Sequence, residues 1–440
     1  MYHYNLLDGY CDGAEAYCKR LQTFAEENLA WMRQYIAKYP NDPYWRQVNM
    51  TIAHVIGMID GYEGTLFSGR ADHETIAHKI YMLQLDSEAD DMEGVLGRPA
   101  EVRRRRDHCS AIVKVTPGNQ NLFFAHNTWD TYASMLRVQR RISFQLKDLP
   151  GRTYTMSSDP GTLPSGDDFM LSSANVAIME TTNAVYDETL YKQVATRMAA
   201  SAADWTSIFS RFNSGTYNNQ WMVVDYNLFT PGMSTLPKGL LYVLEQLPGT
   251  IEIEDMTERL QTDRYWASYN VPYNNFSTDP LSMHEGCTPR GNAVLSLAAR
   301  GDLNPYKGSC PISELNANDD VATDYKVDIW EFDLSDMITD VNLMKTLSFD
   351  SEAGPTHQDL PPFDWSTAHL NEKVRHVGHP TVFNFSPIRH IWGVDPVVLC
   401  KDSAHGGLDW YDSNTKAAKK QTCRKDVARI QFANKINETG

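Results

Sequence analysis

A cysteine and a histidine lie on two neighbouring strands that the sequence predicts. Residues 109–115 and 122–126 have the two-residue period of β-strands, and the loop of residues 116–121 between them is rich in turn formers. If the turn is centred between Pro117 and Gly118, Cys109 faces His126, although hairpin registers can slip by a residue or two. The hairpin therefore predicts a thiol and an imidazole as neighbours, groups that can serve as nucleophile and base.

The chain before Cys109 suggests a second way to activate its thiol. Arg103 to Arg106 form a like-charged run, which is a solvated linker in the simplest interpretation and a protease-sensitive junction in the other. An isolated cysteine is usually a small buried hydrophobe. If the His108–Cys109 bond is cut, however, Cys109 gains its own general base, because the released α-amine has a reference pKa of about 7.7–8.0.

The composition excludes several classes of protein. The 440 residues include 40 Lys plus Arg against 56 Asp plus Glu, a formal net charge of −16 that disfavours sequence-unspecific binding to nucleic acid. No apolar run approaches the ~20 residues that span a bilayer, so a transmembrane segment is not expected. The sequence contains no CxxC pair, phosphate-binding glycine loop or HExxH motif. No metal or organic cofactor is expected, because Cys109 would supply both the nucleophile and the base.

The cysteines and glycosylation motifs favour an oxidising, secretory-type compartment. Cys11 and Cys18 are close enough in sequence to form a disulfide at the start of a helix, and the odd total of seven cysteines leaves one outside any full pairing. N-glycosylation motifs occur at Asn49, Asn275 and Asn437. The first residues lack the basic and apolar regions of a signal peptide. Either the protein is cytosolic, or this chain begins downstream of its true start.

Helical and extended patterns alternate along the chain. Amphipathic helices are predicted for residues 14–39, for residues 45–59, after Asp72 as N-cap, and for residues 190–212, and further strands for residues 221–226 and 250–253. Antiparallel strands with flanking helices, an α+β fold, are the natural interpretation. Asp167 and Asp168 follow Ser165-Gly166 and predict a turn, to which we assign no chemistry.

Seven ordered motifs in this sequence resemble the phospholipase B-like proteins of the N-terminal-nucleophile hydrolase superfamily. The motifs are residues 109–111 (CSA), 125–129 (AHNTW), 165–169 (SGDDF), 180–182 (ETT), 218–226 (NNQWMVVDY), 265–272 (YWASYNVP) and 385–389 (FSPIR). The resemblance extends over nearly everything from Tyr4 to Trp392. It implies an αββα sandwich of antiparallel sheets, made as one precursor and cut autocatalytically between His108 and Cys109.

The resemblance also implies roles for individual residues. Cys109 attacks an acyl carbon of the substrate, a phospholipid in this family, while its α-amine shuttles the proton. His126, Trp129 and Thr182 line the active site, and Asn270 donates a hydrogen bond to the developing oxyanion, which needs preorganised donors.

This sequence departs from the family pattern in three places. Family members begin with a signal peptide and a segment of strands that this chain lacks, so we expect a truncated form. A segment that carries a substrate-site arginine is deleted between Tyr273 and Ser277. Where the family has a close cysteine pair, this chain has His284 and Cys287, so that disulfide is not expected.

The sequence predicts three regions and leaves three functions open. Residues 1–108 form a mainly helical chain with the arginine linker, residues 109–394 the nucleophile-bearing core, and residues 395–440 a polar extension. The first functional hypothesis is a lysosomal or secreted phospholipase B-like hydrolase. Its two cleaved chains stay associated, and the sequence is compatible with a homodimer. The alternatives are an amidase acting on peptide or N-acyl amide bonds, and a non-catalytic glycoprotein of the same fold.

Overall fold

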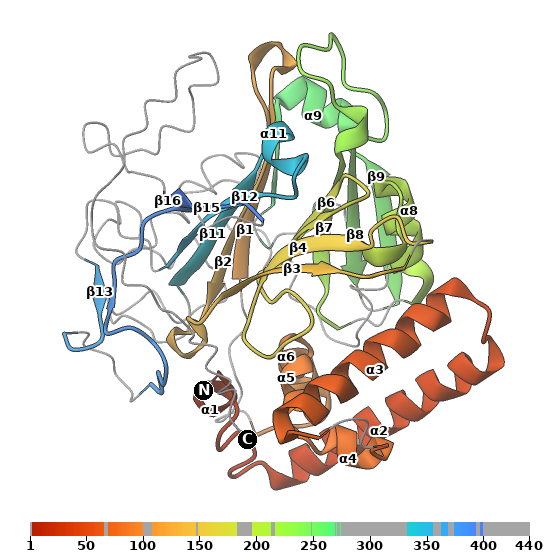
Figure 1. The fold of residues 1–440 in the computed structure, drawn as a ribbon, viewed down its shortest axis with the longest axis vertical. Coiled ribbons are helices and arrows are strands. Elements are labelled where there is room, and N and C mark those ends of the chain that lie inside the picture. Colours follow the sequence, from red (N-terminus) through yellow and green to blue (C-terminus); the bar gives the residue numbers. More distant parts are fainter. Residues whose placement is uncertain are drawn as a thin grey trace, which may run out of the picture.

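Two antiparallel β-sheets of seven strands each form the centre of the protein (Figure 1). The computed structural model describes residues 2–65, 69–99, 108–146, 148–182, 196–212, 216–247, 249–268, 270, 273, 332–354, 362–367, 374–392 and 397–398. The first sheet has the order β10 (Tyr265–Ser268), β1 (His108–Val115), β2 (Leu122–Asp130), β11 (Phe332–Thr339), β12 (Phe349–Ala353), β15 (Ile388–His390) and β16 (Val397–Val398). The second has the order β3 (Val138–Ser143), β4 (Thr153–Ser158), β5 (Phe169–Ser172), β6 (Val176–Thr182), β7 (Asn219–Asp225), β8 (Leu241–Leu247) and β9 (Thr250–Asp255). A small separate ladder joins β13 (Phe363–Asp364) to β14 (Val382–Phe383).

The two sheets pack face to face through an apolar core. Side chains alternate along β1 and β2, so that Val113 and Phe124 are fully buried while Ile112 and Phe123, on the other face, are half-buried. The buried set meets Phe169 and other inward side chains of the second sheet in one cluster. The predicted sandwich of antiparallel sheets with helices, an α+β fold, is confirmed.

Helices cover the outer face of the second sheet and one end of the sandwich. Helix α8 (Ala202–Phe209) begins after Ser201, whose side chain accepts from the backbone N–H of Asp204. Its Trp205 packs on Trp221 of β7 with ring centroids 5.2 Å apart. The short helices α9 (Thr257–Asp263) and α11 (Val341–Met344) lie at the end of the sandwich where the β1–β2 turn also lies (Figure 1).

The N-terminal residues form a helical unit at the opposite end (Figure 1). It consists of α1 (Tyr2–Leu6), α2 (Glu15–Lys38), α3 (Pro43–Glu63), α4 (Asp72–Ile76), α5 (Lys79–Gln84) and α6 (Asp86–Val95). Helices α2 and α3 correspond to the first two predicted helices, and a disulfide joins Cys11 to Cys18, with Cα atoms 5.9 Å apart, where the sequence predicted it. The predicted N-cap at Asp72 is wrong: Asp72 is the first helical residue, because Glu74 reaches back to accept from the backbone N–H of Ala71.

The helical unit has its own apolar core, which extends into the sheet-bearing part. Leu163 belongs to that core, and its backbone N–H donates to Oε1 of Gln84 over 2.7 Å. The buried Arg197 donates to the carbonyl of Gln47 over 3.3 Å. Residues on both sides of Cys109 in the sequence are therefore held together by packing and by buried polar contacts.

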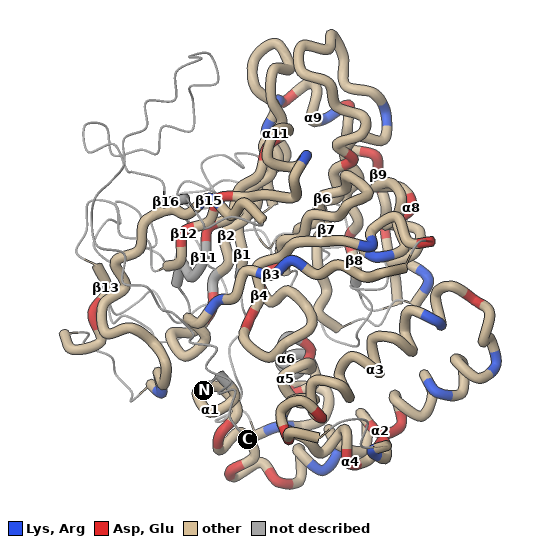
Figure 2. The backbone as a smooth tube through the Cα atoms, viewed as in Figure 1, with Lys and Arg blue, Asp and Glu red and all other residues tan. Residues whose placement is uncertain are grey.

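Charged side chains are distributed unevenly over these elements. Figure 2 shows that helix α2 carries residues of both signs along its length, whereas the strands of the sheets are mostly uncharged. The buried faces of the sheets tolerate few charges because desolvation of an ion is costly. Among the described helices, none is both long and apolar enough to cross a bilayer.

A half-buried histidine on β15 makes the fold sensitive to acid. Burial lowers the pKa of His390 to about 4; its ring packs on Phe349 and its Nε2 lies 2.8 Å from Oγ of Ser351. The histidine of the unfolded chain, with a pKa near 6.5, binds the proton first. The contribution of His390 to stability is therefore full above pH 6.5 and is lost as the pH falls toward 4.

We expect the free energy of unfolding to fall less in His390→Gln than in wild type when the pH is lowered from 7 to 5. The difference, measured by urea denaturation, should be about 1–2 kcal/mol. His73→Gln, at an exposed position on α4, is the control and should lose as much as wild type. An equal loss in all three proteins would contradict the assignment.

Candidate active site

The β1–β2 hairpin brings Cys109 and His126 to one face of the first sheet, but not opposite each other. Cys109 pairs with Thr128 and Ala111 with His126, so the predicted register is wrong by two residues. The cause is the turn, in which Gly118 and Asn119 both have positive φ, 66° and 52°, and move its centre toward the C-terminus. A shift of two preserves the face. Cys109 and His126 are diagonal neighbours, and both are buried.

Asn270 ties the start of β1 to the end of β6. Its Oδ1 accepts from the backbone N–H of Cys109 over 3.1 Å, and its Nδ2 donates to the carbonyl of Thr182 over 2.6 Å. Asn270 has a φ of 63°, a left-handed conformation that asparagine tolerates better than most residues. Its own backbone N–H lies 3.4 Å from Oγ1 of Thr181. The carboxamide thus fixes the nitrogen of Cys109, a role that differs from the oxyanion donor predicted from the resemblance and does not test it.

His126 is oriented by two hydrogen bonds, and its burial favours the neutral form. Its Nε2 lies 2.7 Å from the carbonyl oxygen of Glu180, which can only accept, so Nε2 carries the proton. Nδ1 then accepts from Oγ1 of Thr128 over 3.3 Å. Burial lowers the pKa of His126, although the nearby carboxylates of Asp168 and Asp167 act in the opposite direction. Because both ring nitrogens are engaged, His126 fixes β2 against β6 in this state.

Two buried carboxylates and a buried tyrosine form one hydrogen-bonded group. The hydroxyl of Tyr217 lies 2.5 Å from Oδ2 of Asp168 and 3.1 Å from Oε1 of Glu180. Burial raises the pKa of Tyr217 well above its ordinary value, and the charges of Asp168, Glu180 and Cys109 raise it further. The thiol and the phenol therefore lie within electrostatic reach of each other.

The turn at Asp167 and Asp168 was predicted, but its chemistry was missed. The backbone N–H of Asp168 donates to the carbonyl of Ser165 over 3.3 Å, and Asp168 has a φ of 44°. Both aspartates are nevertheless fully buried, which a surface turn would not produce. The available signal was a pair of carboxylates directly before the apolar strand β5, since such a turn points into the sandwich rather than toward water.

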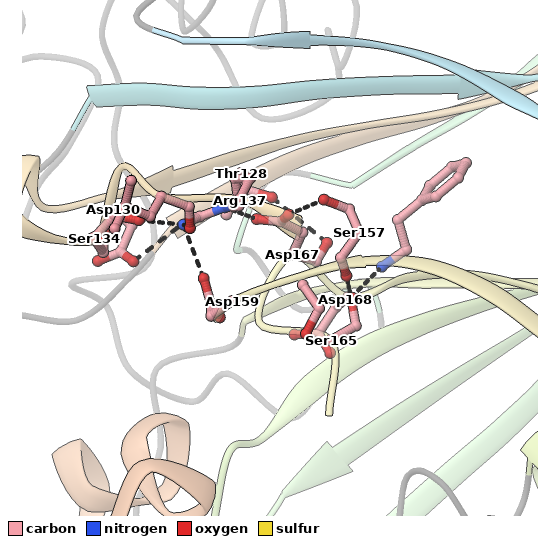
Figure 3. A network of polar contacts seen from close by, with 12 residues as sticks. Thr128, Asp130, Ser134, Arg137, Ser157, Asp159, Ser165, Asp167 and Asp168 are labelled. Carbon is pink, nitrogen blue, oxygen red and sulfur yellow. Dashed lines mark hydrogen bonds and ion pairs between the residues drawn. The ribbon is translucent and has the colours of Figure 1, made fainter. Parts of the chain in front are cut away.

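The loop between β4 and β5 carries Asp159, Asp167 and Asp168 and is called the acidic loop below. Arg137 pairs with two of these carboxylates (Figure 3). Its Nε donates to Oδ1 of Asp167 over 2.7 Å, its Nη1 lies 2.8 Å from Oδ1 of Asp159, and its Nη2 lies 3.8 Å from Oδ2 of Asp130. Ser157 also donates to Asp167. Such compensation is required because an unpaired buried charge is strongly destabilising. The guanidinium thus holds Asp167 in place. The backbone carbonyl of Asp167 lies 3.5 Å from Oγ1 of Thr128, the residue whose hydroxyl contacts His126.

The remaining predicted residues are placed only in part. The backbones of His108 and Trp129 pair with each other in the β1–β2 ladder, but their side chains lie outside the described part of the structure. Asn49 is exposed on α3, and its Oδ1 accepts from Arg33 over 3.3 Å. Asn275 and Asn437, like His284 and Cys287, lie outside the described residues. Within the described ranges, no group of three or more His, Cys, Asp or Glu side chains is arranged to hold a metal ion.

The structure is an α+β sandwich with a buried cysteine at the start of β1, the strand next to the edge strand β10. The backbone nitrogen of this cysteine donates to the carboxamide of Asn270, which follows β10. The family model for phospholipase B matches residues 1–275 and 273–390. The chain therefore belongs to the phospholipase B family.

Individual relatives cover most of this chain. Phospholipase B-like 1 of Caenorhabditis elegans is 35% identical over 89% of this chain and 79% of its own length. Phospholipase B-like 2 of Homo sapiens is 32% identical over 89% of this chain and 78% of its own length. Phospholipase B-like protein B of Dictyostelium discoideum is 29% identical over 82% of this chain and 72% of its own length. Among solved structures, a conjugated bile acid hydrolase from Clostridium perfringens aligns over 63% of this chain and 98% of its own, at 9% identity and a TM-score of 0.33.

Gly166 tests how closely the acidic loop is fitted. A Cβ atom at this position would overlap the carboxylate of Asp159, which Arg137 holds in place. We expect Gly166→Ala to lower the free energy of unfolding by about 1–3 kcal/mol, measured by urea denaturation. Gly57→Ala, in an exposed turn of α3 with nothing near the added methyl, is the matched control and should stabilise the protein by about 0.5–1 kcal/mol. A neutral Gly166→Ala would show that the loop can move away.

Proposed function

We propose that this protein is an acyl hydrolase whose nucleophile is Cys109, released as a new N-terminal residue by cleavage of the His108–Cys109 bond. The observation that carries the proposal is the hydrogen bond from the backbone nitrogen of Cys109 to Oδ1 of Asn270. That nitrogen is the leaving group of the cleavage and then the general base of turnover, so its position must be fixed in both. The proposal also takes support from membership of the phospholipase B family.

The cleavage is an intramolecular acyl shift followed by hydrolysis. The sulfur of Cys109 adds to the carbonyl carbon of His108, and the carbon–nitrogen bond breaks as the nitrogen takes up a proton. A thioester then joins the two residues. Water hydrolyses the thioester, which leaves a carboxyl group on His108 and returns the thiol of Cys109 beside its own α-amine.

Turnover repeats this chemistry on an external substrate. The α-amine accepts the thiol proton and the sulfur attacks the acyl carbon. The carbon–oxygen or carbon–nitrogen bond of the substrate then breaks as the ammonium gives its proton to the departing alcohol or amine, and water hydrolyses the thioester to release the acid. In this scheme Asn270 holds the amine and donates to the oxyanion, a type of donor worth about 10²–10³ in rate. Trp129 and Thr182 line the substrate site.

The substrate proposed first is an acyl ester of a phospholipid, which the family name supports. An amide is the second candidate, because the bond that Cys109 must break in its own maturation is an amide. Loss of the arginine-bearing segment would favour a third outcome, a non-catalytic glycoprotein. Cleavage at Cys109 separates the first two candidates from the third.

The two chains produced by cleavage stay associated in this proposal, as residues 1–108 and the core of residues 109–394, with residues 395–440 as an extension. The shared apolar core at Leu163 and the buried contacts of Arg197 support this association. The disulfide at Cys11 supports a lysosomal or secreted location, since disulfides persist in oxidising compartments. The exposed Asn49 supports glycosylation there.

Autocatalytic cleavage can be tested directly on the full chain. After incubation at mildly acidic pH, intact mass and N-terminal sequencing should find a chain that begins at Cys109 in wild type and none in Cys109→Ala. Cys109→Ser, whose hydroxyl is the weaker nucleophile, should be cut more slowly. Lys114→Ala, at an exposed position on the same strand, should be cut like wild type. One uncut chain in all four proteins would refute the proposal and favour the non-catalytic glycoprotein.

A further inference from the structure

Three buried polar side chains form a row across the second sheet, called the polar row below. Thr181 of β6 pairs with Gln220 of β7, and Gln220 pairs with Glu245 of β8. Side chains two apart on a strand share a face, so the polar row lies on the same face as Met222, which packs in the core between the sheets. Each of the three residues is at most 2% exposed. The polar row therefore faces the first sheet.

Two members of the polar row hold β10 and the chain that follows it. Oε1 of Gln220 accepts from the indole N–H of Trp266 in β10 over 3.2 Å. Oε1 of Glu245 accepts from the backbone N–H of Tyr273 over 2.5 Å and from Nε2 of Gln220 over 2.7 Å. Because β10 is the edge strand of the first sheet as described, these bonds hold it from across the sandwich.

The third member, Thr181, connects the polar row to the residue that contacts the nucleophile. Its Oγ1 lies 2.6 Å from Oγ of Ser268, the last residue of β10, and accepts from the backbone N–H of Asn270 over 3.4 Å. A hydroxyl has one donor and two acceptor positions, so it can serve both neighbours. Oδ1 of Asn270 in turn accepts from the backbone N–H of Cys109 over 3.1 Å. A chain of hydrogen bonds thus runs from the second sheet to the nitrogen of Cys109.

The pairing of β1 with β10 places this chain of bonds at the nucleophile. Ala111 packs in the core between the sheets and pairs with Ser268. Cys109 lies two residues before Ala111 on the same strand, so its side chain shares that face. The same register, continued by two residues, places Asn270 opposite Cys109. Thr181 and the thiol therefore border the same layer between the sheets.

Asn270 depends on such support because of its backbone conformation. Its φ of 63° lies in the left-handed region, which is less favourable than the extended or helical regions for residues other than glycine. A hydrogen bond to its backbone N–H helps to hold this conformation. Without it, the carboxamide of Asn270 would be free to move away from the nitrogen of Cys109. A misplacement of ~1 Å in an active site can cost about 10²-fold in rate.

We propose that Thr181 is a positioning residue, whose hydroxyl, held by Ser268, fixes the backbone of Asn270 so that the carboxamide meets the nitrogen of Cys109. The other two members of the polar row hold the chain on either side of Asn270. The inference rests on the proposed function, because it needs this nitrogen as the leaving group of cleavage and the base of turnover. Thr181 acts through Asn270 in this role.

The test measures the rate at which the full chain is cut before Cys109 at mildly acidic pH, followed by intact mass. Thr181→Val keeps the shape of the side chain and removes the hydroxyl, and should slow the cleavage at least about tenfold. Thr181→Ser keeps the hydroxyl, and should be cut within about threefold of the wild-type rate. Urea denaturation of each uncut protein measures its stability separately.

The matched control removes another buried threonine hydroxyl between the sheets. Thr155 of β4 is fully buried, and its Oγ1 donates to the carbonyl of Leu347 over 2.9 Å. Thr155→Val should lower the free energy of unfolding as Thr181→Val does, and should still be cut within about threefold of the wild-type rate. If Thr181→Val does not fold, Ser268→Ala removes the partner of Thr181 and should slow the cleavage at least about threefold.

The outcomes separate this inference from the proposal beneath it. Cleavage of folded Thr181→Val, or of Ser268→Ala in its place, at the wild-type rate overturns the positioning role. Equal slowing in Thr155→Val also overturns it, since a general loss of stability then explains both results. Slow cleavage of Thr181→Ser does the same, because the hydroxyl is present. Absence of cleavage in wild type, by contrast, refutes the proposed function itself.

Discussion

The face-to-face packing of the two sheets is the constraint on which the site depends. Apolar side chains such as Val113 of β1 and Phe169 of β5 fill the space between the sheets and leave it dry. At the end of the sandwich where β1 begins and β6 ends, this apolar filling gives way to polar side chains. Polar groups at that end are cut off from water, and each one must find a protein partner or a ligand.

Two of these polar groups bond to the backbone of the opposite sheet. His126 of β2 reaches the carbonyl of Glu180, and Asn270, which follows β10, reaches that of Thr182, so two side chains hold the end of β6. Arg137 holds the acidic loop from the side. The result is a rigid frame around the nitrogen of Cys109. Rigid frames suit acyl transfer, because donors that need no reorganisation stabilise the transition state best.

The N-terminal helices join this frame without belonging to either sheet. Their core continues into Leu163, on the segment that leads to the acidic loop, and Oε2 of Glu88 in α6 accepts from Thr216, the neighbour of Tyr217. A cut before Cys109 would therefore leave the helical unit bound by contacts that do not involve the cut bond.

The sequence by itself determined the local elements and the family. The two-residue period after residue 108 predicted β1 and β2, the helical period predicted α2 and α3, and the short spacing of Cys11 and Cys18 predicted their disulfide. Seven motifs were enough to indicate the phospholipase B-like family, which the family model supports independently. These features depend on a few neighbouring residues, which is why they can be inferred from the chain alone.

Only the tertiary structure decided the register of the hairpin and which polar side chains are buried. The turn at Gly118 and Asn119 set a register two residues from the predicted one, because left-handed backbone conformations there are not visible in strand periodicity. Asp167 became a buried group because Arg137, thirty residues earlier in the chain, folds against it. Likewise, Asn219 is buried by segments that offer it no partner among the described residues. Burial and partnership are decided by distant segments that meet in the fold, and no local pattern records those meetings.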